Sequence, residues 1–240
     1  MHGRAASQLV RWQYLRGLRT AKMRYACLFV VAVLTPFPAY AGPILVNGSF
    51  ELGPPPFFNQ DIDILPGSTD ITGWTITGGG VDLLASPWDV SDGVRAIDLD
   101  RRSPGGIEQT FATVIGQAYV VSFDLSGNPG NGQPGTGLPF TKQLRVDAGG
   151  VSQTYSFDSS GLSIEALLWQ TITFTFLASD TTATLSFNSL SSEQDASYGA
   201  LIDNVSVSAV PEPSTLLLIG PSFLAGILAV CRLRTRRTNL

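Results

Sequence analysis

The chemistry open to this 240-residue chain is limited first by the residue types that its central region lacks. Its single histidine is His2 and its two cysteines are Cys27 and Cys231, all of them outside residues 42–210. The central region therefore contains no histidine base, no thiol nucleophile and no disulfide. A hydrolase that uses a Ser-His-Asp or Cys-His arrangement is excluded from it.

Carboxylate pairs are the remaining source of catalytic chemistry. Asp98 and Asp100 stand two residues apart in a segment with strand-like alternation, so both side chains would lie on one face of the strand. Two such carboxylates could serve a glycoside hydrolase. Because the central region has 18 acidic residues, a pair at this spacing is expected by chance. The sequence thus predicts a protein that is not an enzyme, with a glycoside hydrolase as the weaker alternative.

Aromatic side chains are the stronger candidates for a functional site, because exposed rings stack on the apolar faces of sugar rings. Trp88 comes first, since a proline precedes it and an aspartate follows it, as in a loop. Trp74 lies in an apolar segment and is predicted to belong to the core. The further candidates for carbohydrate binding are Trp169, Tyr155, Tyr198 and Phe140.

Charge is divided unevenly along the chain. Residues 42–210 contain 18 Asp/Glu and five Lys/Arg, a net charge of −13, whereas the two ends are basic. An acidic surface repels phosphate backbones, so the sequence predicts no nucleic-acid partner. The same surface is compatible with hydrated polysaccharide and with hard cations such as Ca²⁺.

The central region has the pattern of short β-strands separated by Gly, Pro, Asn and Asp. Three segments alternate apolar and polar residues most clearly, at 118–125, 170–178 and 182–189, and period-two alternation is typical of half-buried strands. Further strands are predicted at 73–77, 81–84, 95–98, 107–111, 142–146, 153–157 and 201–208. About ten short strands over residues 42–209 predict an all-β fold, a two-sheet antiparallel β-sandwich.

The N-terminal region predicts export. Residues 23–41 combine a basic start, an apolar stretch at 26–34 and a small-x-small site, which is the pattern of a secretory signal peptide. The apolar stretch is shorter than the roughly 20 residues that span a membrane. Residues 1–22 are either an upstream extension before a true start at Met23 or a long basic n-region of the signal peptide. The predicted cleavage site consists of Ala39, Ala41 and Gly42.

Residues 210–240 contain an apolar run between a Pro-Glu-Pro corner and a group of arginines. Residues 216–230 carry no charge, and a transmembrane helix over about 214–231 would be close to the lower length limit for a span. The segment could be a permanent anchor, a core helix, or a signal that is later removed. Four arginines follow this segment, and the positive-inside rule would keep them in the cytoplasm. They are Arg232, Arg234, Arg236 and Arg237.

The order of these parts resembles the PEP-CTERM protein-sorting signal, whose motif here is Val210-Pro211-Glu212-Pro213. The resemblance implies an exported protein of a Gram-negative bacterium that makes extracellular polysaccharide. Signal peptidase and then an exosortase-type enzyme would process it, and the C-terminal helix would hold it in the inner membrane during transit. The final location would be the cell surface or the extracellular matrix. A processed sorting signal is therefore favoured over a permanent anchor.

The central region resembles the choice-of-anchor C domain. That family is similar to plant cell-wall proteins with a galactose-binding-like jelly roll and to several carbohydrate-binding modules. The resemblance therefore implies a jelly-roll fold and leaves the ligand open. The matching pieces follow one another over nearly the whole region, at residues 47–51, 73–74, 81–82, 91–93, 96–99, 107–111, 122–129 and 202–207.

The same resemblance implies one cofactor, because carbohydrate-binding jelly rolls often carry a structural Ca²⁺ that joins their first and last strands. Glu51 and Asp203 would be its ligands, and other oxygens would complete the six to eight that the ion requires. Alternatively, Asp203 caps a turn and Glu51 is solvated.

Together these patterns predict a surface-sorted, non-catalytic protein that binds or organises extracellular polysaccharide. The alternative is a structural matrix protein or adhesin without a small ligand.

Overall fold

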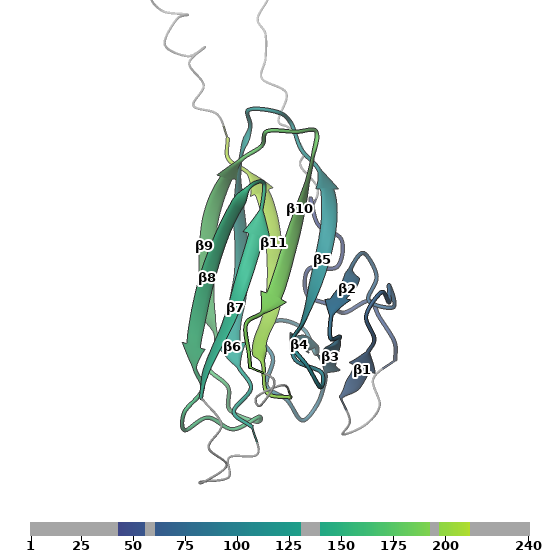
Figure 1. Ribbon diagram of the computed structural model, residues 1–240, viewed down its shortest axis with the longest axis vertical. Coiled ribbons are helices and arrows are strands. Elements are labelled where there is room, and N and C mark those ends of the chain that lie inside the picture. Colours follow the sequence, from purple (N-terminus) through teal and green to yellow (C-terminus); the bar gives the residue numbers. More distant parts are fainter. Residues whose placement is uncertain (1–42, 56–60, 131–139, 193–196, 212–240) are drawn as a thin grey trace, which may run out of the picture. The chain divides into compact units, whose positions relative to one another are not determined.

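The alternating segments of the central region form antiparallel β-strands (Figure 1). The computed structural model describes residues 43–55, 61–130, 140–192 and 197–211. The strands in these ranges are β1 (Ile62–Ile64), β2 (Thr75–Gly78), β3 (Val81–Leu84), β4 (Ala96–Asp98), β5 (Gly105–Ala112), β6 (Ala118–Gly127), β7 (Thr141–Ala148), β8 (Val151–Asp158), β9 (Gln170–Leu177), β10 (Thr182–Ser189) and β11 (Ala200–Ala209).

The strands build two sheets, as predicted for a β-sandwich. The six-stranded sheet has the order β1-β3-β4-β11-β6-β9, and the five-stranded sheet has the order β2-β5-β10-β7-β8. Each of the ten predicted segments overlaps one of these strands, which confirms the predicted two-sheet antiparallel fold. Strand β1 was not predicted, because three residues are too few to show a period of two.

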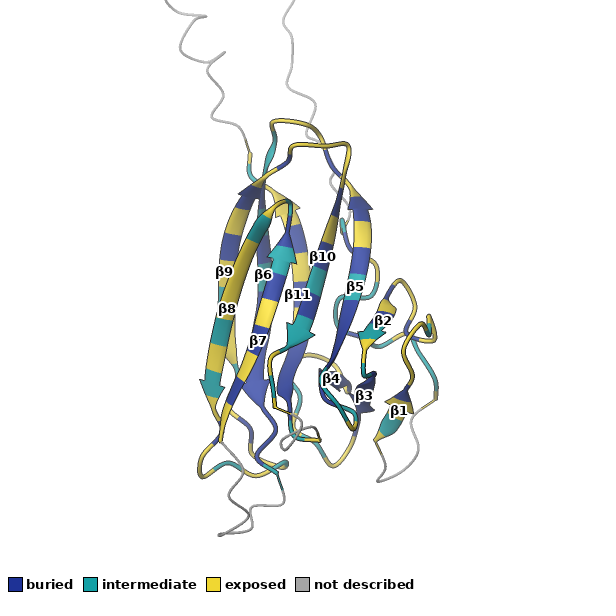
Figure 2. Ribbon diagram, in the orientation of Figure 1, coloured by how far each residue is buried: buried dark blue, intermediate teal, exposed yellow. Residues whose placement is uncertain are grey.

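The core lies between the two sheets, and the alternation of apolar residues decides which side chains enter it. Figure 2 shows buried and exposed residues alternating along β9 and β10, where Phe174 and Phe176 of β9 are buried while the threonines beside them are exposed. Trp74 is only 1% exposed, which confirms it as a core residue. Its ring lies 5.4 Å from that of Phe50 and 6.4 Å from that of Phe187, measured between centroids.

Strand β6 runs the length of the sandwich and defines its two ends. At one end Ala118 accepts a hydrogen bond from the backbone N–H of Val210, and the chain leaves the sandwich there after β11. At the other end Gly127 pairs with Ala200, and Asn128 donates its N–H to the carbonyl of Gly199. Loops that follow β6 and precede β11 therefore meet at the end opposite to the exit of the chain.

Several predicted features lie outside the described residues. Among these are the signal-peptide residues Ala39, Ala41 and Gly42, and Glu212 and Pro213 of the sorting motif. The helix predicted at about 214–231 and the four arginines after it lie outside as well. In the ranges that the structure does describe, no helix has the length and apolar character needed to cross a membrane. Val210 and Pro211 directly follow β11.

Candidate functional site

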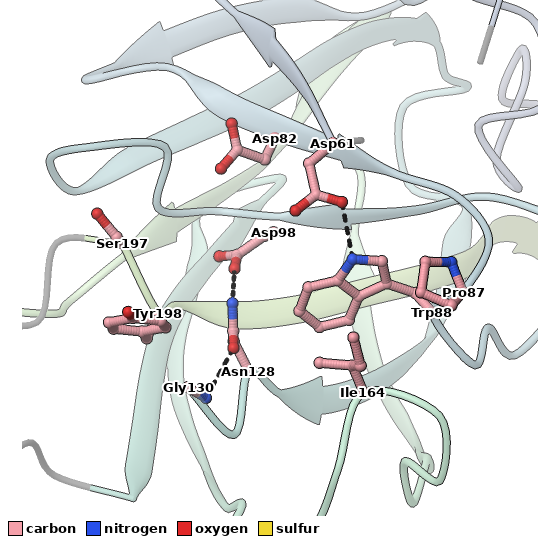
Figure 3. Close-up of a pocket in the computed structure, with 10 residues that line it drawn as sticks. All are labelled: Asp61, Asp82, Pro87, Trp88, Asp98, Asn128, Gly130, Ile164, Ser197 and Tyr198. Atoms are coloured by element: carbon pink, nitrogen blue, oxygen red, sulfur yellow. Dashed lines mark hydrogen bonds between the residues drawn. The ribbon is translucent and has the colours of Figure 1, made fainter. Parts of the chain in front are cut away.

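A pocket of about 470 Å³ opens at the end of the sandwich where β6 ends (Figure 3). Strands β3 and β4 form part of its wall, and loops before β1, after β3, after β6 and before β9 and β11 contribute the rest. The lining residues are Asp61, Asp82, Pro87, Trp88, Asp98, Asn128, Gly130, Ile164, Ser197 and Tyr198.

The pocket lies on the face of the six-stranded sheet that points away from the main core. Ile97 of β4 packs in the main core, so the side chains on either side of it point to the other face. There Ala96 joins a second, smaller cluster with Leu84, Leu167 and Leu201. This cluster supports the loops that surround the pocket, and Asp98 lies on the same face of β4 as Ala96.

Three carboxyl groups form a row across neighbouring strands at this site. Asp63 of β1 pairs with Asp82 of β3, and Asp82 pairs with Asp98 of β4. Residues that are directly paired in an antiparallel sheet point to the same face. Like charges in this arrangement repel each other, so the row needs protons or cations to be stable. Arg101 and Arg102 supply positive charge to Asp63, with N–O distances of 3.1 and 3.2 Å.

Asp98 is the most deeply buried acid of the pocket wall, with 1% of its surface exposed. Burial raises its pKa to about 8, and the nearby charge of Asp100 adds to this effect. Hydrogen bonds from Asn128 Nδ2 (2.6 Å) and from the backbone N–H groups of Asp100 and Gly199 oppose it. Asp98 therefore keeps its proton at neutral pH.

Asp82 is half-buried, and its pKa is raised to about 9. Burial is the largest cause, followed by the charge of Asp98, a hydrogen bond shared with Asp63, and the charges of Asp63 and Asp61. Its Oδ1 atom is buried and has no hydrogen-bond partner among the described residues. The pocket wall thus contains a carboxyl oxygen whose hydrogen-bonding capacity is unused.

Two aromatic rings accompany these acids. The indole Nε1 of Trp88 donates a hydrogen bond of 2.7 Å to Asp61 Oδ1, which fixes the plane of the half-buried ring. Tyr198 carries the second ring, and Lys142 Nζ lies 5.9 Å from its centroid. In the view of Figure 3 the two rings lie on either side of Asp98 and Asn128. Of the predicted sugar-binding aromatics, the structure therefore brings Trp88 and Tyr198 to one pocket.

The other predicted aromatics lie elsewhere. Tyr155 packs edge-on against Phe123 of the core, with ring centroids 5.6 Å apart, and its hydroxyl donates to Gln153. Trp169 packs against the small cluster beneath the pocket loops. Phe140 is 46% exposed and directly precedes β7. These three rings do not belong to the pocket lining.

Glu51 and Asp203, the predicted calcium ligands, both bind the loop between β3 and β4. Glu51 Oε1 accepts the backbone N–H groups of Val94 and Arg95 at 2.8 and 3.0 Å. Asp203 Oδ2 accepts those of Ser91 and Asp92 at 2.9 and 2.8 Å. Burial raises the pKa of Asp203 to about 7, although these backbone hydrogen bonds oppose the shift. In the structure both carboxyl groups fix a loop.

These residues as placed do not supply the six to eight oxygens of a calcium site. Within the described residues no group of three or more His, Cys, Asp or Glu side chains could hold a metal ion. Calcium at Glu51 and Asp203 stays a prediction. If the ion is bound, EGTA is expected to lower the melting temperature by several degrees and excess CaCl₂ to restore it. Identical melting curves in EGTA and CaCl₂ would remove calcium from the description of this domain.

Among the pocket residues that the sequence did not suggest for the site are Asp61, Asp82 and Asn128. Asp98 was considered together with Asp100, but Asp100 is fully buried and does not line the pocket. The neighbour of Asp98 in the pocket is Asp82, which comes from another strand. Asp82 and Asn128 do lie within segments that resemble the choice-of-anchor C domain. That resemblance was the one feature of the sequence that could have drawn attention to these two residues.

The fold and the pocket define an antiparallel β-sandwich with an acidic pocket, flanked by aromatic rings, at one end. The chain belongs to the family described as "Protein of unknown function (DUF642)", whose family model matches residues 43–208. It is also 32% identical over 205 residues to Halomucin from Haloquadratum walsbyi. That match covers 81% of this chain but spans only 2% of the length of Halomucin.

Solved structures with a similar fold include two carbohydrate-binding modules and a cyclase. TmCBM61 in complex with beta-1,4-galactotriose is 16% identical with a TM-score of 0.44, and the match covers 71% of this chain and 100% of that one. CBM35 from Paenibacillus barcinonensis is 15% identical with a TM-score of 0.38, over 63% and 100%. The cyclase from Fischerella sp. TAU is 16% identical with a TM-score of 0.44, over 71% and 97%. Likenesses this distant assign no ligand and no activity.

Proposed function

We propose that this protein binds a polysaccharide through the pocket beside Trp88 and Tyr198 and does not catalyse a reaction on it. The observation that carries the proposal is the combination of two aromatic rings with carboxyl and amide groups in one pocket. Rings provide apolar area for the faces of a sugar, and planar polar groups such as Asn128 bind its hydroxyls.

The protonation of the pocket acids supports a binding role over a hydrolytic one. A glycoside hydrolase needs one carboxylic acid and one ionised carboxylate beside the scissile bond. The pKa values of Asp82 and Asp98, about 9 and about 8, leave both groups protonated at pH 7. Two neutral carboxyl groups can bind sugar hydroxyls, but neither is prepared to act as nucleophile or base.

We also infer that the protein is exported and sorted to the cell surface or matrix. The support is the signal-peptide pattern at 23–41 and the sorting-signal pattern at 210–240, with signal peptidase and an exosortase-type enzyme as processing partners. The pocket and Val210 lie at opposite ends of the sandwich. A protein held by its C-terminal segment would therefore present the pocket away from the point of attachment.

A binding screen tests this proposal. The purified protein is run by affinity electrophoresis through gels that contain neutral, acidic or amino-bearing polysaccharides, and reducing ends are measured after long incubation. We expect retardation by at least one polysaccharide without any release of reducing ends. Gln143→Ala, an exposed position on β7 away from the pocket, serves as the control and should migrate as the wild type does.

The other outcomes decide between the alternatives. Migration unaffected by every polysaccharide would favour the structural matrix protein or adhesin. Release of reducing ends would show a hydrolase.

A further inference from the structure

The ionisable residues that line the pocket are all acidic. Three of its lining residues carry carboxyl groups, Asp61, Asp82 and Asp98, and none of the lining residues is Lys, Arg or His. The row of acids does receive positive charge at its β1 end, where Arg101 and Arg102 bind Asp63. None of the described lining residues supplies such a charge, and the cation recorded beside them is Lys142, whose Nζ lies 5.9 Å from the ring centroid of Tyr198.

The buried oxygen of Asp82 that lacks a hydrogen-bond donor indicates which chemical group a ligand would supply. Oδ1 is buried and has no donor among the described residues, and a buried acceptor without a donor is unfavourable. Repulsion from Asp98, Asp63 and Asp61 contributes to the high pKa of this carboxyl group. A positively charged donor would satisfy the oxygen and relieve the repulsion at the same time.

Within the described residues no group of three or more His, Cys, Asp or Glu side chains could hold a metal ion, so an organic cation suits this pocket better. A single ammonium group needs only one or two acceptors, and it has three N–H bonds to donate. The ring of Trp88 is suited to such a ligand as well, since cations are attracted to aromatic faces, whereas Tyr198 already has Lys142 Nζ 5.9 Å from its ring centroid and offers apolar area. The rings and the acids together favour a sugar over a simple amine.

We infer that the pocket takes a sugar unit with a free, protonated amine, such as a 2-amino-2-deoxyhexose, whose ammonium group binds Asp82 beside the rings of Trp88 and Tyr198. This inference rests on the proposed function and specifies its ligand. Acidic and neutral polysaccharides bind less tightly because they bring no positive charge to Asp82.

Three oligosaccharides that differ at a single position test the inference. They are β-1,4-linked hexamers of glucosamine, N-acetylglucosamine and glucose, which carry an amine, an acetamide or a hydroxyl at C2. Isothermal titration calorimetry of the full chain in detergent at pH 6 is expected to show at least tenfold tighter binding of the amine than of the other two. Asp82→Asn should reduce this preference below threefold.

Proton release gives a second measurement. The groups that face Asp82 are Asp63 on β1, with its two arginines, Asp98 on β4, and Asp61. An ammonium group beside Asp82 favours the ionised carboxylate, so binding should expel up to about one proton. Titrations in two buffers with different ionisation enthalpies should show this release for the wild type and not for Asp82→Asn.

Asp70→Asn is the matched control, because it makes the same Asp-to-Asn replacement at an exposed loop position. It should keep the full preference for the amine, and an equal loss in both variants would show attraction by net charge alone and overturn the inference. Equal or weaker binding of the glucosamine hexamer would overturn it while leaving the proposed function intact. If no polysaccharide of the electrophoretic screen binds either, the proposed function fails with it.

Discussion

Replacing Trp88 by Ala is expected to weaken polysaccharide binding at least tenfold, which corresponds to about 1.4 kcal/mol or more. The ring contributes apolar area to the pocket, and its bond to Asp61 fixes its plane before the ligand arrives. Aromatic residues of this kind contribute most of the affinity at many binding sites. Calorimetric titration of the polysaccharide found in the binding screen measures the change.

Trp169→Ala is the matched control for this prediction. Both tryptophans are half-buried and pack against the small cluster under the pocket loops, but only Trp88 lines the pocket. Both variants should therefore lose similar stability, whereas only Trp88→Ala should lose affinity. Trp88→Phe keeps a ring but removes the hydrogen bond to Asp61, and an intermediate affinity is expected. Unchanged binding in Trp88→Ala would exclude this ring from the site.

The domain is expected to be more stable at pH 5 than at pH 8, which is the second large effect. The pKa values of Asp82, Asp98 and Asp203 are raised to about 9, 8 and 7, against 3.8 for an unperturbed carboxyl group. Between pH 4 and these values the folded state binds more protons than the unfolded state. The free energy of unfolding therefore falls as pH rises through this window, by at most about 1.4 kcal/mol per pH unit for each such group.

Carboxyl groups with lowered pKa values do not reverse this trend. Hydrogen bonds from Ser91, Thr171 and Asn204 outweigh burial and lower the pKa of Asp124. Its contribution to stability is lost only when the pH falls below about 4. Urea denaturation at several pH values between 5 and 8 measures the trend, and a free energy of unfolding that rises with pH would contradict the assignment of buried, protonated acids.

Asp82→Asn is expected to raise the stability at pH 8 and to flatten the pH dependence. Asparagine has nearly the same shape and is neutral without binding a proton, so folding at pH 8 no longer requires proton uptake at this position. After allowance for the solvent that reaches this half-buried side chain, the gain is about 1–3 kcal/mol at pH 8 and close to zero at pH 5. Asp70→Asn makes the same Asp-to-Asn replacement on an exposed loop and should leave the slope as in the wild type.

The strands and their buried faces could be predicted because both follow from neighbouring residues. In β9 the alternation of threonine with Ile172, Phe174 and Phe176 identifies the strand and the side that enters the core. Trp88 could be placed in a loop for the same reason. Tyr155 also alternates with polar residues in β8, but it was predicted to bind sugar, and the structure instead packs its half-buried ring against the core.

The pocket acids could not be predicted, because their proximity depends on strand register. Asp82 and Asp98 lie opposite each other only because β3 and β4 pair in one register, and no local pattern contains this information. The roles of Glu51 and Asp203 could not be predicted from the sequence either. A carboxyl group that binds backbone N–H groups and one that binds a cation look the same in a sequence.

The position of the pocket relative to Val210 has a mechanical consequence. Strand β6 has ten residues, about 33 Å at 3.3 Å per residue, and it separates Asn128 at the pocket from Ala118, which is bonded to Val210. A pull between a bound polysaccharide and the C-terminal segment acts along the antiparallel pair of β6 and β11. The hydrogen bonds between β6 and β11 run perpendicular to the strands. A force along the strands therefore loads all of these hydrogen bonds at once in shear, whereas a force across the strands would break them one after another. The pair is thus oriented to withstand tension between ligand and attachment point.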